Sequence, residues 1–223
     1  MPTAPTRLVT ATQALERNRS LDRLRSVYGV LAAPLDRWSG SELLRSGMIG
    51  HALHPLLTDL PVGFWTAATA LDLRGRPQDR EASRWLVGAG LAAAGPTALT
   101  GLAEWAPVGT EAQRVGALHG ALNATASGLY VVSFVARSRR RHTLGVVTAL
   151  AGAALTAASG YLGGHLTTAR KVGSRDPAFA RDSVGPPDLA PADGLPATAA
   201  AAPAAQDAPA DPLDPLLGPG ALT

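Results

Sequence analysis

The sequence predicts an all-α integral membrane protein: an up-down-up-down four-helix bundle with amphipathic N-terminal helices and a disordered C-terminal tail. The first observation is four charge-poor apolar stretches, each near the length of about 20 residues that a bilayer-crossing helix needs. The second is the short connections between them, which favour antiparallel neighbours. The third is the low aromatic content, 4%, beside many small residues that let membrane helices approach closely. A soluble alanine-rich bundle is the alternative.

The chain divides into three regions, 1–50, 51–172 and 173–223. The first carries seven arginines against four acidic residues, and its apolar residues fall at helical spacing. These helices would lie on the membrane surface or form a soluble helical cap. The third region is dominated by Pro, Ala and Asp and is predicted to form a tail without a packed core. The apolar residues of the N-terminal helices are Leu21, Leu24, Tyr28 and Leu31.

The middle region holds the four predicted membrane spans. Pro55 suits the first helical position of the first span. Asp72, at the end of that span, is expected to pair with a nearby arginine rather than to act in chemistry. The arginines within reach in sequence are Arg74, Arg76 and Arg84. The predicted spans are 55–73, 85–103, 115–136 and 143–166.

Composition excludes several kinds of chemistry. The chain has no cysteine, which rules out disulfides, thiolate nucleophiles, iron–sulfur clusters and cysteine-type zinc sites. All but one of its 20 basic residues are arginines, as is typical of a GC-rich bacterial genome, and they cluster at the ends of apolar stretches. This pattern indicates a multi-pass protein of the bacterial cytoplasmic membrane, and the absence of interleaved aromatic and basic residues argues against nucleic-acid binding.

Polar residues gather at one end of the predicted bundle. In an up-down bundle, the starts of the first and third spans and the ends of the second and fourth share one membrane face. Ionisable groups at such positions are costly and usually functional. His142 falls at the opposite end, in an arginine-rich loop. The candidate metal ligands are His51, His54, Glu104, His119 and His165, with Asp59, Asn123 and Tyr161 as polar support.

Three interpretations of this cluster stay open. In the first, His54, His119 and His165 bind a cofactor, either haem or a transition metal, in membrane redox chemistry; bis-histidine haem ligation would join His119 to one of the other two. In the second, His119, Asp59 and His165 form a proton or quinone relay without a metal. In the third, the polar groups only cross-link helices by hydrogen bonds. Whether the protein is an enzyme is left open.

Four runs of the sequence carry a family resemblance: GHALHPLLTDLPVGFWTAATALDL, GLAEW, RVGALHGALN and GYLGGHL. They resemble, over about residues 40–172, the bacterial membrane proteins classed as domain of unknown function 2231. The resemblance implies four transmembrane helices, and some members carry a Rieske iron–sulfur domain after the last helix. The residues matching the family's recurrent polar positions are His51, His54, Asp59, Glu104, His119, Asn123 and His165.

The chain departs from the family pattern at two places. Ala52 stands where many relatives have a proline, and the run 167–173 differs from the one that usually follows the last helix. Because the chain has no cysteine, an electron-transfer role would need a histidine-bound cofactor or a separate partner such as a Rieske-type protein. The alternative function is a non-enzymatic membrane scaffold or anchor for a partner protein. The lipid bilayer is a partner in either case, and the oligomeric state is not predicted.

Overall fold

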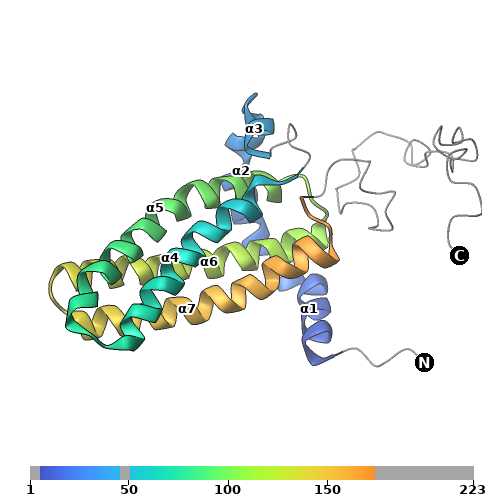
Figure 1. Cartoon of the computed structure of the whole chain (residues 1–223). Coiled ribbons are helices and arrows are strands. Elements are labelled where there is room, and N and C mark those ends of the chain that lie inside the picture. Colours follow the sequence, from blue (N-terminus) through green and yellow to red (C-terminus); the bar gives the residue numbers. More distant parts are fainter. Residues whose placement is uncertain (1–5, 46–50, 174–223) are drawn as a thin grey trace, which may run out of the picture. The chain divides into compact units, whose positions relative to one another are not determined.

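The computed structural model describes residues 6–45 and 51–173, and in these residues every element assigned, apart from two isolated bridge residues, is a helix. The predicted all-α class is therefore confirmed. Four long helices run beside one another, joined by short connections (Figure 1). The predicted tail lies outside the described residues, apart from Gly173. The long helices are α4 (Leu53–Arg74), α5 (Arg80–Trp105), α6 (Thr110–Ser138) and α7 (His142–Gly164), with α7 continuing as a π-helix over His165–Ala169.

The helices begin and end where local chemistry dictates. Gly75 ends α4 in the left-handed conformation, at φ 67°, which glycine adopts without a steric penalty. Helices α5 and α6 each begin five residues before the predicted spans, because their first turns are polar but still helical. Glu81 and Glu111 lie in those first turns, where the helix dipole stabilises a negative charge.

The bundle consists of two helical hairpins, α4 with α5 and α6 with α7, and the two hairpins pack more loosely on each other. Trp65 of α4 joins them at mid-height. Its ring stacks on that of Tyr130 of α6, with centroids 3.9 Å apart, and its Nε1 donates to the carbonyl of Val87 in α5. Gly90 makes room for this indole, since a Cβ there would lie 2.2 Å from Trp65 Nε1.

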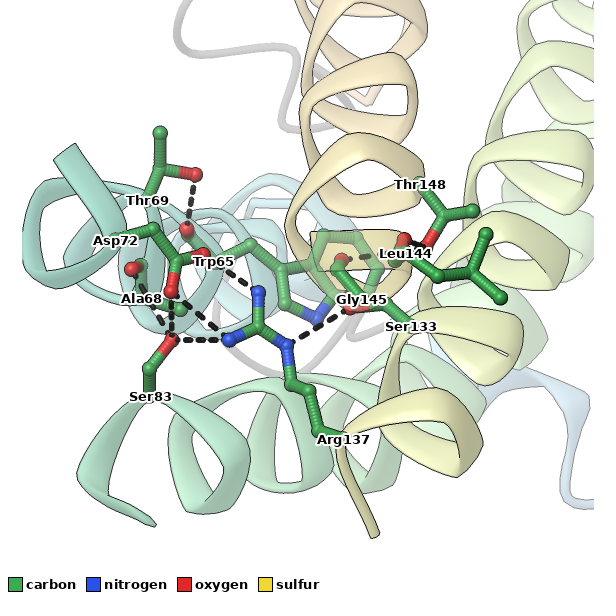
Figure 2. Close-up of polar contacts among 10 residues, drawn as sticks. All are labelled: Trp65, Ala68, Thr69, Asp72, Ser83, Ser133, Arg137, Leu144, Gly145 and Thr148. Carbon is green, nitrogen blue, oxygen red and sulfur yellow. Dashed lines mark hydrogen bonds and ion pairs between the residues drawn. The ribbon is translucent and has the colours of Figure 1, made fainter. Parts of the chain in front are cut away.

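A buried ion pair between Asp72 and Arg137 lies at the end of the bundle opposite His54 and His119 (Figure 2). Two guanidinium nitrogens of Arg137 donate to the two carboxylate oxygens of Asp72, at 2.8 and 2.5 Å. Arg137 also donates to the hydroxyls of Ser83 and Ser133, and the latter donates to the carbonyl of Gly145. These contacts connect all four long helices at one point.

The prediction that Asp72 pairs with an arginine near it in the sequence is therefore wrong. The expectation assumed a partner near in sequence, whereas Arg137 lies 65 residues further along the chain. The antiparallel arrangement brings the C-terminal ends of α4 and α6 together, and Arg137 is the arginine that faces inward there, with 1% of its side chain exposed. The arginines that were expected to pair with this carboxylate are Arg74, Arg76 and Arg84.

Two helical stretches among the described residues are long and apolar enough to cross a membrane, Pro77–Trp105 and His142–Ala169. Less than a third of the most apolar part of each is buried within the protein, so much of their apolar surface faces outward. The other two long helices, α4 and α6, carry more polar residues. The topology with four membrane spans stays a prediction.

Three shorter α-helices precede the bundle among the described residues: α1 (Arg7–Arg17), α2 (Asp22–Arg37) and α3 (Ser41–Arg45), with a 3-10 turn over Arg19–Leu21 between the first two. They lie against the histidine end. Arg114 of α6 holds Asp22 by two hydrogen bonds, of 2.8 and 3.1 Å, and Arg45 donates to the carbonyl of Ala103 in α5. Helix α2 packs on both α5 and α6, so this segment covers the side of the bundle where its two hairpins meet.

Candidate functional site

His54 and His119 both line two cavities at one end of the bundle, here called the histidine end. The first, here called the inner chamber, has a volume of about 290 Å³ and lies between the two hairpins and α2. The second, here called the outer cavity, has a volume of about 230 Å³ and is lined by the π-helix and by Glu104. His54, Thr58 and His119 line both. The two imidazoles therefore stand at the boundary between the cavities.

The ring of His54 is fixed by a contact across the first hairpin. Its Nδ1 lies 2.9 Å from the carbonyl oxygen of Thr97 in α5. A carbonyl can only accept, so Nδ1 carries the hydrogen and Nε2 presents a lone pair. None of the described residues hydrogen-bonds to that Nε2. Gly101 lets the ring pack against α5, because a Cβ there would lie 2.7 Å from the ring carbon Cε1.

His119 is held by the equivalent contact in the second hairpin. Its Nδ1 lies 2.8 Å from the carbonyl oxygen of Ser159 in α7, so Nδ1 donates here too. Its Nε2 accepts from the side-chain amide of Asn123, at 3.1 Å. The hydroxyl of Ser159 donates to the carbonyl of His119, at 3.0 Å. Both ring nitrogens are thus engaged, which distinguishes this histidine from His54, whose ring centroid lies 6.3 Å away.

The walls of the inner chamber are mainly apolar. Trp65 and Trp105 contribute indole rings, while Tyr28 and Leu31 of α2 complete one side. Leu31 remains 54% exposed, so this side of the chamber borders the outer surface of the bundle. An apolar pocket with a few convergent polar groups is the usual form of a site for a small molecule.

Glu104 is the candidate carboxylate that lies near the two imidazoles. It is buried, with 4% of the residue exposed, and lines the outer cavity together with His54 and His119. Asp59 is exposed and lines neither cavity. His51 is likewise exposed, at the start of the domain. The predicted set is therefore divided between the cavities and the surface.

His165 belongs to a different cluster. Its Nε2 lies 2.6 Å from a carboxylate oxygen of Glu16 in α1, which also receives hydrogen bonds from Arg170. Hydrogen bonding from Arg170, supported by that from His165, holds the pKa of Glu16 below its ordinary value of 4.5, although burial opposes the shift. Tyr161 lies nearby, with its hydroxyl 3.4 Å from that of Thr12. This cluster fastens α1 to the end of α7.

Several residues of the site were not expected from the sequence. Thr97 and Ser159 orient the histidines through backbone carbonyls, which no side-chain pattern can indicate. Trp65 and Trp105 are aromatic, and a sequence does not distinguish an aromatic residue that lines a cavity from one that packs in a core. The sequence offered one indication for Glu16: it lies four residues after Thr12 and so on the same face of a helix. The structure shows that both residues are buried.

The five predicted metal ligands are not assembled at one point. Among residues 6–45 and 51–173, no group of three or more histidine, cysteine, aspartate or glutamate side chains is placed to hold a metal ion. The two cavities instead bring together an imidazole nitrogen to which no described residue hydrogen-bonds, a second imidazole held by hydrogen bonds and, in the outer cavity, a buried carboxylate. Such groups can bind a hydroxyl and exchange its proton.

Comparison with known proteins gives a single kind of match. The family model described as "Predicted membrane protein (DUF2231)" matches residues 50–176, which contain both cavities' histidines and all four long helices. No curated protein and no solved structure matches the chain.

Proposed function

Because the chain belongs to the DUF2231 family of predicted membrane proteins, we propose that it binds a small lipophilic molecule in the inner chamber. The ligand class is one with a ring-sized head that carries a hydroxyl or carbonyl group, as quinols and quinones do. The observation that supports this most directly is the Nε2 of His54, an acceptor nitrogen on the wall of an apolar chamber. Because none of the described residues hydrogen-bonds to this acceptor, it favours a ligand that supplies a donor.

The chamber's size suits such a head group. Its volume of about 290 Å³ is about twice that of an engineered 150 Å³ cavity that binds one benzene ring. A ligand hydroxyl would donate to Nε2 of His54, and the indoles of Trp65 and Trp105 would contact its ring. The ligand would enter from the lipid side between Leu31 and Val62, since both line the chamber and both are partly exposed.

The haem or metal expected from the sequence would occupy the same chamber and is tested in the same preparation. Bis-histidine ligation of haem by His54 and His119 would require Nε2 of His119 to exchange its hydrogen bond from Asn123 for the iron. If the bound molecule is a quinol, its electrons would pass to a separate one-electron acceptor, such as a Rieske-type protein. A Soret band or a stoichiometric metal in the purified protein would favour the cofactor over the lipophilic ligand.

The test is a binding titration on protein purified into lipid nanodiscs. A short-chain quinol is added while tryptophan fluorescence is recorded, because Trp65 and Trp105 line the chamber. Saturable quenching is expected. Replacing His54 by leucine removes the acceptor and should raise Kd about 5- to 150-fold, corresponding to the 1–3 kcal/mol cost of leaving a buried hydroxyl unpaired.

Two further variants make the titration interpretable. Leu102→Trp fills the chamber while keeping His54, and it should abolish binding. His142→Leu removes a histidine at the opposite end of the bundle and should leave Kd unchanged. Absence of saturable quenching in the wild type, or normal binding by His54→Leu, would refute the proposal.

A further inference from the structure

His54 and Glu104 lie at different depths along the bundle axis. The contacts of the His54 ring place it level with Thr97 and Gly101 in α5. Glu104 lies three residues beyond Gly101 toward the end of α5, which is about 4.5 Å further out at 1.5 Å per residue. The carboxylate therefore stands on the outer side of the imidazole.

The outer cavity is built at the end of the family-matched domain. Ala52 and Gly173, which lie just outside the long helices, both line it and are joined by a backbone hydrogen bond of 3.1 Å. Its wall on the α7 side is formed largely by glycine and by the π-helix, a widened turn that is frequent at functional sites. Gly163 leaves no room for a side chain, since a Cβ there would lie 2.9 Å from the ring of His119.

From this arrangement we infer that the outer cavity is a water-side entrance through which protons reach the inner chamber, with His54 and Glu104 as the exchanging groups. The inference rests on the proposed binding of a hydroxyl-bearing ligand in that chamber. Glu104 is the one carboxylate that lines either cavity in the part of the chain that the structure describes. A lipophilic ligand and its protons then use different routes, the first from lipid and the second from water.

The proton moves in three steps, and no electron is transferred in them. The ligand O–H bond breaks as its proton passes to Nε2 of His54, which gives an imidazolium. That proton then passes through water in the outer cavity to the carboxylate of Glu104, and finally to bulk water. His119 is a positioning residue in this scheme, because Asn123 occupies its Nε2.

The first test locates the two routes without any ligand. The chain has no cysteine, so Thr167→Cys and Ser127→Cys each carry a single thiol, in the outer cavity and the inner chamber respectively. In nanodiscs, a charged thiol reagent should label Thr167→Cys at least about tenfold faster, because a charge enters an apolar chamber only by losing its hydration. A lipid-soluble reagent should reverse the order. Equal labelling of both thiols by the charged reagent would overturn the water-side assignment.

The second test follows the proton itself. A nitrophenol that titrates near neutral pH is bound in the chamber, and its colour is recorded after a pH jump. Glu104→Gln should slow the colour change by about 10²-fold or more, the usual contribution of a positioned acid–base group, while the affinity stays the same. Glu104→Asp, which keeps the carboxylate, should restore most of the rate.

The control is Glu111→Gln, because Glu111 lies at the same end of the bundle but outside both cavities, on Arg170. It should leave the rate unchanged. An unaltered rate in Glu104→Gln, with nitrophenol bound, would overturn this inference alone. Failure of the wild type to bind the nitrophenol and the quinol would overturn the proposed function and the proton route together.

Discussion

The buried ion pair between Asp72 and Arg137 allows a quantitative test of how the bundle is held together. We predict that Arg137→Met destabilises the protein by about 3–5 kcal/mol, the cost of leaving one charge of a buried pair without its partner. The side chains of Arg137 and Asp72 are only 1% and 6% exposed, so water cannot replace the lost guanidinium.

The neighbouring serines should add little to this cost. Without Arg137, the hydroxyl of Ser83 still reaches the carbonyl of Ala68 and the carboxylate of Asp72. The hydroxyl of Ser133 keeps its bond to the carbonyl of Gly145, at 2.6 Å. The unpaired carboxylate is therefore the main consequence of the substitution.

The measurement is thermal unfolding in detergent, followed by tryptophan fluorescence. At about 2–4 °C per kcal/mol for a chain of this size, the expected fall in Tm is about 6–20 °C. Arg139→Met is the matched control, since Arg139 is exposed two residues away, and its Tm should stay within about 2 °C of the wild type, because surface substitutions rarely exceed 0.5 kcal/mol.

The double variant Asp72→Leu/Arg137→Met separates pairing from packing. Replacing both charges by apolar groups is often neutral or stabilising, so the double variant should be more stable than Arg137→Met alone. A double variant that loses the sum of the two single losses would refute the pairing argument. So would an Arg137→Met protein with the Tm of the wild type.

Two other predictions concern the Glu16 cluster and the packing of Trp65. Because its folded-state pKa is depressed, Glu16 stabilises the protein above pH 4.5, and this contribution is lost as the pH falls through the folded-state pKa. Glu16→Gln should therefore lower the free energy of unfolding by about 2 kcal/mol at pH 7, because the charged hydrogen bonds with Arg170 are lost. Between pH 4.5 and 3, the Tm of this variant should fall less than the Tm of the wild type. Gly90→Ala should destabilise the protein by about 1–3 kcal/mol by displacing Trp65, whereas Gly128→Ala, in open space, should stabilise it slightly; equal Tm changes in the two variants would contradict the packing.

The sequence was sufficient to predict the helices and the end of the bundle at which His54, His119 and His165 lie. Both follow from the length of the apolar stretches and from the up-down connections between them. The sequence could not show which carbonyls orient the histidines or which arginine faces Asp72. Those contacts depend on the rotation of each helix and on its axial position against its neighbour, where Gly90 and Gly101 leave room for the rings of Trp65 and His54.

The sequence does indicate in part which side chains of α4 face the cavities. Asp59 follows His54 by five residues, which places it about 140° around the helix, so the two side chains cannot line the same cavity. Thr58, four residues after His54, is the one that shares both cavities with it.

Axial register explains why the four histidines do not converge. The bond from His119 to the carbonyl of Ser159 places those two residues at one level. His165 then lies six residues further along α7, about 9 Å closer to the end, where α1 supplies Glu16. A smaller offset in α5, about 4.5 Å, sets Glu104 outward of His54, so one end of the bundle holds the inner chamber, the buried carboxylate of Glu104 and the Glu16 cluster at successive depths. Paired cysteines test this register: a disulfide should form between cysteines at positions 119 and 159, and one between positions 119 and 165 would contradict it.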